Sequence, residues 1–120
     1  MSEPWRNDER IAGAHVKISH VREDGHLMRT VASISDGDNV HMGVAMRHPN
    51  DPNFSRKRGR RIAVGRAKFA LARSLKFTER VGRDSRYDLI VTVSQDNFLE
   101  AARKLGIPIP DPEIETEKAV

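Results

Sequence analysis

Residues 15–47 read HVKISHVREDGHLMRTVASISDGDNVHMGVAMR, and this stretch decides the fold. Apolar and polar residues alternate from His15 to Val21 and again from Val40 to Arg47, which is typical of half-buried strands. Between these runs, the residues from Leu27 to Ile34 are rich in β-branched types, which favours a third strand. The stretch therefore predicts a three-stranded antiparallel meander.

Turn and stop signals delimit these strands. Asp24-Gly25 predicts a hairpin, and DGDN at 36–39 predicts a second turn, because Gly tolerates the positive φ of tight turns. Pro49 and Pro52 are expected to end the sheet, since proline cannot donate to a strand ladder. Four residues that suit a helix N-cap follow: Asn50, Asp51, Asn53 and Ser55.

A helix of about 20 residues is predicted next, from its apolar periodicity. The side that should face the sheet carries Ala63, Val64, Ala67, Ala70, Leu71 and Leu75. Gly59 and Gly65 each cost such a helix roughly 1 kcal/mol relative to Ala. We expect a close backbone approach to offset that cost, and we expect Phe54 to anchor the start of the helix against the sheet.

The remainder of the chain predicts one more strand and one more helix. Residues 78–86 indicate a charged loop, and the Leu-Ile-Val run within Tyr87 to Ser94 favours a central strand buried on both faces. Ser94 can cap a short helix from Gln95 to Leu105, which Gly106 can end. The fold class is therefore α+β, with the order β-β-β-α-β-α: an antiparallel meander packed against one long basic helix and one short C-terminal helix.

The domain boundaries follow from composition. Residues 1–12 are expected to form a flexible N-terminal arm, and residues 13–107 a single α+β domain. Residues 108–120 contain three prolines, and four acids lie between Asp111 and Glu117, so we expect a disordered acidic tail. An alternative is that this tail folds back over the basic helix as an electrostatic cover.

The main functional signal is a concentration of positive charge. Residues 56–76 (RKRGRRIAVGRAKFALARSLK) hold nine of the 21 basic residues and no acid, whereas the whole chain carries a net charge of only +4. Such a field attracts phosphate backbones, acidic protein surfaces or anionic lipid. The competing interpretation is a solvated helix face whose long side chains cover apolar surface. Solvated faces usually mix charge signs, however, which favours an anionic partner.

Six residues are the candidate binding residues for nucleic acid or another partner: Arg56, Lys57, Arg58, Arg60, Arg61 and Lys68. A dense, unselective cluster of this kind favours contacts to phosphate rather than to bases. Aromatic residues are scarce, and single-strand binders need aromatic platforms for stacking. The pattern therefore favours duplex or protein partners.

Other chemistries have weak support. Cysteine is absent, which excludes disulfides, thiolate metal sites and a cysteine nucleophile. No recognisable catalytic motif is present, so we expect no enzymatic activity and no cofactor. The carboxylates have no spacing that singles out a nuclease pair. His20, His26 and His41 could meet across the strands, but histidines satisfied by hydrogen bonds are the favoured interpretation, and no metal is expected.

The segment from Gly43 to Ala67 resembles a block found in small uncharacterised bacteriophage proteins. The matching features are His48-Pro49, Asp51, Phe54, Gly59, Ile62-Ala63 and Arg66-Ala67. The resemblance covers about a fifth of the chain. It implies a phage or prophage origin and a strand-turn-helix unit, and it implies no activity.

The sequence therefore predicts a small non-enzymatic binding protein of phage type that binds nucleic acid through its basic helix. The alternatives are an inhibitor or host-takeover factor that docks on an acidic host protein, and, less favoured, a small nuclease. The polar N-terminus and the lack of an apolar run near the roughly 20 residues of a membrane span predict a cytoplasmic protein. A homodimer remains open.

Overall fold

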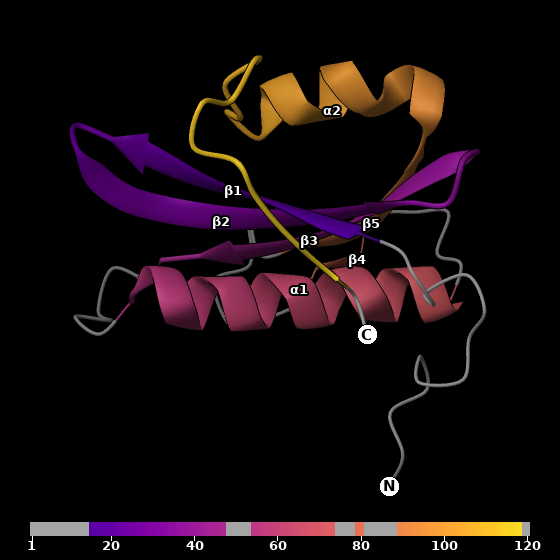
Figure 1. Ribbon diagram of the computed structural model, residues 1–120, viewed down its shortest axis with the longest axis horizontal. Coiled ribbons are helices and arrows are strands. Elements are labelled where there is room, and N and C mark those ends of the chain that lie inside the picture. Colours follow the sequence, from indigo (N-terminus) through magenta and orange to yellow (C-terminus); the bar gives the residue numbers. More distant parts are fainter. Residues whose placement is uncertain (1–14, 48–53, 74–78, 81–88, 119–120) are drawn as a thin grey trace, which may run out of the picture.

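The computed structural model describes residues 15–47, 54–73, 79–80 and 89–118. An antiparallel sheet lies between two helices, which confirms the α+β class (Figure 1). The strands are β1 (His15–Glu23), β2 (His26–Ser35), β3 (Asn39–Met46), β4 (Glu79–Arg80), β5 (Leu89–Ser94) and β6 (Glu115–Lys118). The helices are α1 (Arg56–Arg73) and α2 (Phe98–Lys104). Within the sheet the strands follow the order β4-β5-β3-β2-β1-β6.

The predicted meander is confirmed as β1, β2 and β3, which pair antiparallel in sequence order. Asp24 and Gly25 have φ angles of 51° and 78°, so both central residues of the first hairpin use the left-handed region. In the second turn, Asp36 Oδ1 accepts hydrogen bonds from the backbone N–H groups of Asp38 and Asn39, at 3.0 and 2.8 Å. The DGDN segment is therefore a turn held by its own first side chain.

Helix α1 lies close against the sheet because small residues face each other. A side-chain carbon added at Gly43 of β3 would collide with the backbone of Ala63 and Ala67. Gly59 is also closely packed, since a side-chain carbon added there would lie 2.6 Å from Thr30 Oγ1 of β2 and 3.0 Å from the Phe54 ring. Its cost in helix propensity is therefore offset by packing against side chains rather than against another backbone. Phe54 is half-buried and packs against the core beneath α1, which confirms its predicted role as an anchor.

Two apolar clusters lie on opposite faces of the sheet. One is formed with α1 by Val16, Ile18, Ala32, Ile34, Ala45, Ala63, Val64, Ala67 and Leu71. The other is formed by Val21, Val31, Val40, Met42, Val44 and Leu105, with partly buried residues of β5 and α2 packed against it. The result is a three-layer arrangement with α1 on one face of the sheet and α2 on the other (Figure 1).

The predicted C-terminal helix is divided in two. Gln95–Asn97 form a 3₁₀ turn, and α2 then runs to Lys104. The Ser94 side chain makes no capping hydrogen bond, so this part of the prediction is wrong. Gly106 ends the helix with a φ of 79°, as predicted, and the N–H of Ile107 donates to the carbonyl of Ala102 at 3.0 Å.

The strand β5 is not central, contrary to the prediction. It lies between β3 and the two-residue β4, and its burial alternates, with Ile90 and Thr92 buried and Leu89 and Val91 half-buried. The continuous apolar run arises because one face meets the α1 layer and the other faces α2. Only part of that second face is covered.

The expectation of disorder for residues 108–120 is wrong where the structure describes this segment. Glu115–Lys118 form β6, which pairs antiparallel with β1 from His15↔Lys118 to Ile18↔Glu115. Composition alone missed this strand because its stabilising partners, the open edge of β1 and the basic residues of α1, lie far away in the sequence. The predicted arm at 1–12, both sheet-ending prolines and most of the predicted loop at 78–86 lie outside the described residues.

Candidate functional site

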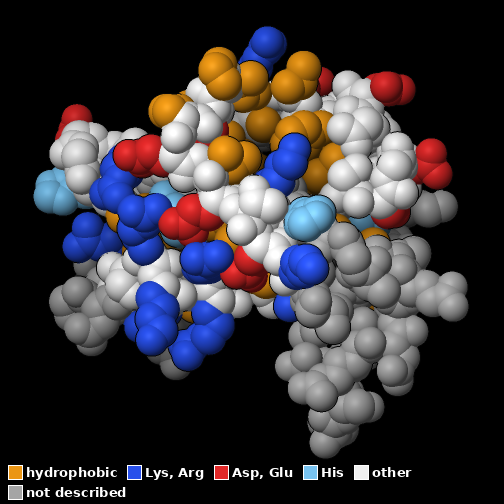
Figure 2. Space-filling model, viewed as in Figure 1, with side chains coloured by type: hydrophobic (Ala, Val, Ile, Leu, Met, Phe, Trp, Pro, Cys, Tyr) orange, Lys and Arg blue, Asp and Glu red, His pale blue; other side chains and the backbone are white. Residues whose placement is uncertain are grey.

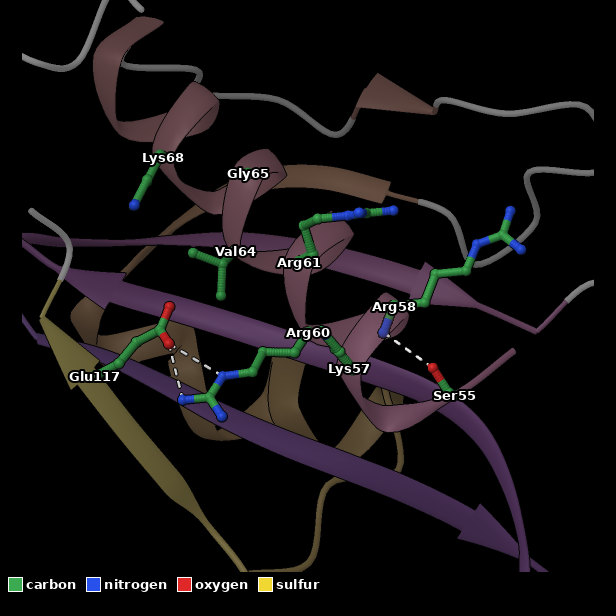
Figure 3. A pocket seen from close by; sticks show the side chains of 9 residues that line it. All are labelled: Ser55, Lys57, Arg58, Arg60, Arg61, Val64, Gly65, Lys68 and Glu117. Atoms are coloured by element: carbon green, nitrogen blue, oxygen red, sulfur yellow. Dashed lines mark hydrogen bonds and ion pairs between the residues drawn. The ribbon is translucent and has the colours of Figure 1, made fainter. Parts of the chain in front are cut away.

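The outer side of α1 carries a surface groove of about 580 Å³ (Figure 3). The residues that line it are Ser55, Lys57, Arg58, Arg60, Arg61, Val64, Gly65, Lys68 and Glu117. Five of the six predicted binding residues are among them, and Arg56 is not. Ser55 stands just before the helix, and its Oγ accepts a hydrogen bond from the N–H of Arg58 at 3.1 Å. Of the four predicted capping residues, Ser55 therefore holds the helix start.

The first group of α1 cations, Lys57, Arg61 and Lys68, forms a row along the outer side of the helix. Lys57 and Arg61 are exposed, and Lys68 is half-buried. Within the described part of the chain, none of the three forms an ion pair. Arg58 is also exposed and lines the same groove. Within the described part of the chain, the positive charge of this row therefore has no ion-pair partner, although Glu117 lines the same groove.

The second group, Arg56 and Arg60, faces β6. Arg56 Nη2 lies 2.6 Å from Glu115 Oε1. Arg60 contacts two carboxylates, with Nη1 3.2 Å from Glu115 Oε2 and Nη2 2.8 Å from Glu117 Oε2. In Figure 3, Arg60 turns toward Glu117, whereas Arg61 extends to the other side of the helix. The carboxylates of β6 therefore occupy one edge of the basic surface.

The third group, Arg66 and Arg73, supports the fold. Arg66 Nη1 donates a hydrogen bond of 2.6 Å to the carbonyl oxygen of Val44 in β3. The Arg73 guanidinium lies over the Phe69 ring, 5.2 Å from its centroid. Neither arginine is among the predicted binding residues.

Glu115 lies where the basic surface meets the sheet. Partial burial raises the pKa of its carboxyl, but the neighbouring His20 ring and the charges of Arg60 and Arg56 outweigh that effect and lower the pKa overall. His20 Nε2 is 3.3 Å from Glu115 Oε2, an ion-pair distance, although the two atoms do not meet the geometry of a hydrogen bond. The carboxylate thus remains charged while it contacts both arginines.

Gly65 is the feature of the groove that differs most from prediction. It was expected to approach another backbone closely. Among the described residues, however, no atom lies within 4 Å of where its side chain would begin. Packing therefore does not explain a glycine at this helical position. Its missing side chain leaves the groove open between Arg61 and Lys68.

The histidines that could have met across the strands have separate partners. His20 Nδ1 is hydrogen-bonded to Thr30 Oγ1 at 3.1 Å, and His41 Nδ1 to Thr92 Oγ1 at 2.9 Å. His41 Nε2 also donates to Asp36 Oδ2 at 2.7 Å. No group of three or more potential metal ligands occurs in the part of the chain that the structure describes.

Charge and apolar surface are segregated on the molecule. On the face shown in Figure 2, Lys and Arg side chains crowd the lower left with carboxylates between them, and hydrophobic side chains gather over α2 at the top. No helix within the described ranges is long and apolar enough to cross a membrane. The sequence reasoning missed the role of Gly65, and it placed the acidic tail over the basic helix only as the less favoured alternative, which the contacts of Glu115 and Glu117 bear out. The alternation of acids in ETEK was the available signal for the two glutamates.

No protein-family model, curated protein or solved structure matches this chain, so its site is interpreted from geometry alone.

Proposed function

We propose that this protein binds the phosphate backbone of duplex nucleic acid through the groove along α1. The observation that carries the proposal is the row of Lys57, Arg61 and Lys68, which has no ion-pair partner among the described residues and runs beside the exposed Arg58. The three like charges of this row lie on one side of the helix and repel one another. An external polyanion relieves that repulsion and releases its own counterions, which favours binding.

The row has a length that suits a polymeric anion. Lys57 and Lys68 are separated by eleven residues, or about 16 Å along a helix that rises 1.5 Å per residue. At 3.4 Å per base step, this length spans about five steps of a duplex. A single phosphate group would contact only part of the row, so a chain of phosphates is the better fit.

The chemistry of the groove favours backbone contacts over base recognition. The aromatic residues in the described part of the chain are Phe54, Phe69 and Phe98, and none of them lines the groove. Single-strand binders that stack bases need such platforms. Lysine and arginine contacts to phosphate carry no sequence information directly, so we expect binding with little sequence preference.

Fluorescence anisotropy of labelled duplex and single-stranded DNA, measured from low to physiological salt, tests the proposal. The expected slope of log K against log salt is about −0.9 for each phosphate neutralised, which gives roughly −3 to −4 for the four cations. The double substitution Lys57→Glu with Arg61→Glu should abolish binding, because it reverses the charge of two of the three cations in the row, at the start of the helix.

The matched control is Arg103→Glu with Lys104→Glu. It makes the same change in net charge at two exposed residues of α2, on the opposite face of the sheet. Its duplex binding should remain close to that of the wild type. Absence of duplex binding at physiological salt would overturn the proposal. The basic surface would then be assigned to an acidic protein, the host partner expected of a phage-type inhibitor.

Gly65→Gln tests the groove without changing its charge. Glutamine is a better helix former than glycine by roughly 0.5 to 1 kcal/mol, so thermal denaturation should show equal or greater stability. Its side chain fills the open space between Arg61 and Lys68, and we expect roughly tenfold weaker duplex binding, or about 1.4 kcal/mol. Unchanged affinity in a stable variant would show that the ligand does not enter the groove at Gly65.

A further inference from the structure

We infer that β6 is a built-in competitor for the nucleic acid, with Glu115 and Glu117 bound where phosphates would otherwise contact Arg56 and Arg60. The inference rests on the proposed function and adds its regulation. Both glutamates lie on the side of β6 that faces α1, whereas Thr116 and Lys118 between and after them are exposed. A strand whose alternate residues are acidic therefore presents its charge to the start of the basic helix.

The contacts resemble those that a phosphate backbone would make. Arg60 binds Glu117 Oε2 through both Nη2 and Nε, at 2.8 and 3.0 Å, and also reaches Glu115. A guanidinium that forks onto oxygens in this way suits carboxylate and phosphate equally. The guanidinium donors that hold Glu115 and Glu117 cannot contact a phosphate at the same time, so the strand and the nucleic acid compete for these donors at this edge of the groove.

The attachment of β6 is weak enough to be displaced. It is four residues long, it lies at the edge of the sheet, and among the described strands it pairs only with β1. Ile114, immediately before the strand, is 45% exposed and so provides little apolar anchoring. Ion pairs between partly exposed side chains contribute only about 0 to 1 kcal/mol each. Short edge segments of this kind open locally at a small fraction of the global unfolding free energy.

The remaining cations allow the exchange to begin. Lys57, Arg61 and Lys68 are not held by β6, so a duplex can bind them while the strand is still in place. Displacement of the glutamates then adds Arg56 and Arg60 to the contact surface. Because coupling between two ligands is reciprocal, bound duplex must loosen β6 by the same factor that β6 weakens duplex binding.

The test compares duplex affinity in wild type and in Glu115→Gln with Glu117→Gln. Glutamine keeps the size of each side chain and removes the charge that competes with phosphate. We expect duplex Kd to fall by roughly tenfold, within the range of about 5- to 150-fold typical of coupled sites. The control is Asp96→Asn with Glu100→Gln, which makes the same change in net charge at exposed residues on the α2 face. Screening over about 10 Å should limit its effect to less than twofold.

Hydrogen–deuterium exchange supplies a readout independent of net charge. Adding duplex to the wild-type protein should speed exchange at the amides of residues 115–118 and of their β1 partners. The outcomes separate the two proposals. If wild type binds duplex but the glutamine variant binds no better than the charge control, and exchange in β6 is unchanged, the competitor role is overturned and the proposed function stands. If neither wild type nor the glutamine variant binds duplex, the proposed function fails.

Discussion

Two histidines in the sheet have the same kinds of neighbour but different sources for their acid. His41 and His20 each place Nδ1 against a threonine hydroxyl on the next strand, and each places Nε2 near a carboxylate. For His41 the carboxylate is Asp36, five residues away and 2.7 Å distant. For His20 it is Glu115 of β6, 3.3 Å distant and shared with two arginines.

The position in the chain of each carboxylate determines what its contact with histidine does. Asp36 is fixed by the turn that it holds together, so its contact with the buried His41 forms within one continuous segment of the sheet. Glu115 comes from a four-residue edge strand that pairs with β1 and binds two arginines of α1 through partly exposed ion pairs. The His41–Asp36 pair therefore belongs to the fold, because its acid lies in the adjoining turn. The His20–Glu115 pair can be exchanged, because its acid lies on an edge strand that can separate from β1.

Replacing Asp36 should have the largest effect. Asp36→Ala removes the partner of the buried His41 and the acceptor for two backbone N–H groups, so we expect a loss of about 2 to 3 kcal/mol in the free energy of unfolding. Urea denaturation measures it. Asp38→Ala is the matched control in the same turn, since the Asp38 side chain is exposed, and it should cost less than about 0.5 kcal/mol. Equal losses in both variants would contradict the structural role of the Asp36–His41 pair.

The two threonines test the contact that both histidines make, which is the hydrogen bond between Nδ1 and a threonine hydroxyl. Thr30→Val and Thr92→Val each remove one buried hydroxyl with little change in shape, and each should cost about 1 kcal/mol. The comparison predicts similar losses of thermal stability for the two variants, because both threonines are buried and bonded to Nδ1. A large difference in the loss of stability would mean that the His20–Thr30 and His41–Thr92 contacts are not equivalent.

The smallest effect concerns pH, and it distinguishes local from global stability. Burial raises the pKa of Asp36, but the His41 hydrogen bond and the N–H groups of Asn39 and Asp38 outweigh it, so its pKa is lowered, as is that of Glu115. A lowered pKa means that each carboxylate stabilises the fold above the ordinary carboxyl pKa of about 4, and that this stability is lost as pH falls through the folded value.

We therefore expect Glu115→Gln to reduce the acid-induced rise in hydrogen exchange of β6 while it leaves global unfolding nearly unchanged. Asp36→Asn should instead flatten the acid limb of global stability, measured by denaturation at successive pH values. Loss of global acid sensitivity in Glu115→Gln would show that β6 is an integral part of the cooperative fold.

Local signals in the sequence predicted most of the sheet and α1. Alternation fixed the faces of β1 and β3, the Asp-Gly pairs fixed the turns, and the small residues of α1 indicated its buried side. The position of β5 was missed because an apolar run does not distinguish a central strand from one whose outer face is half-covered by α2. Among the six predicted binding residues, five share the groove, while Arg56 instead binds Glu115.

The amino-acid sequence by itself determined the meander, the long helix and the concentration of positive charge, because each depends on residues close together along the chain. Only the tertiary structure decided how that charge is divided. Arg66 and Arg73 are used by the fold, Arg56 and Arg60 are paired with β6, and the row from Lys57 to Lys68 remains in the groove. The physical reason is that electrostatic pairing depends on distance in space. The carboxylates of β6 lie nearly sixty residues from their arginines in sequence and about 3 Å from them in the folded protein.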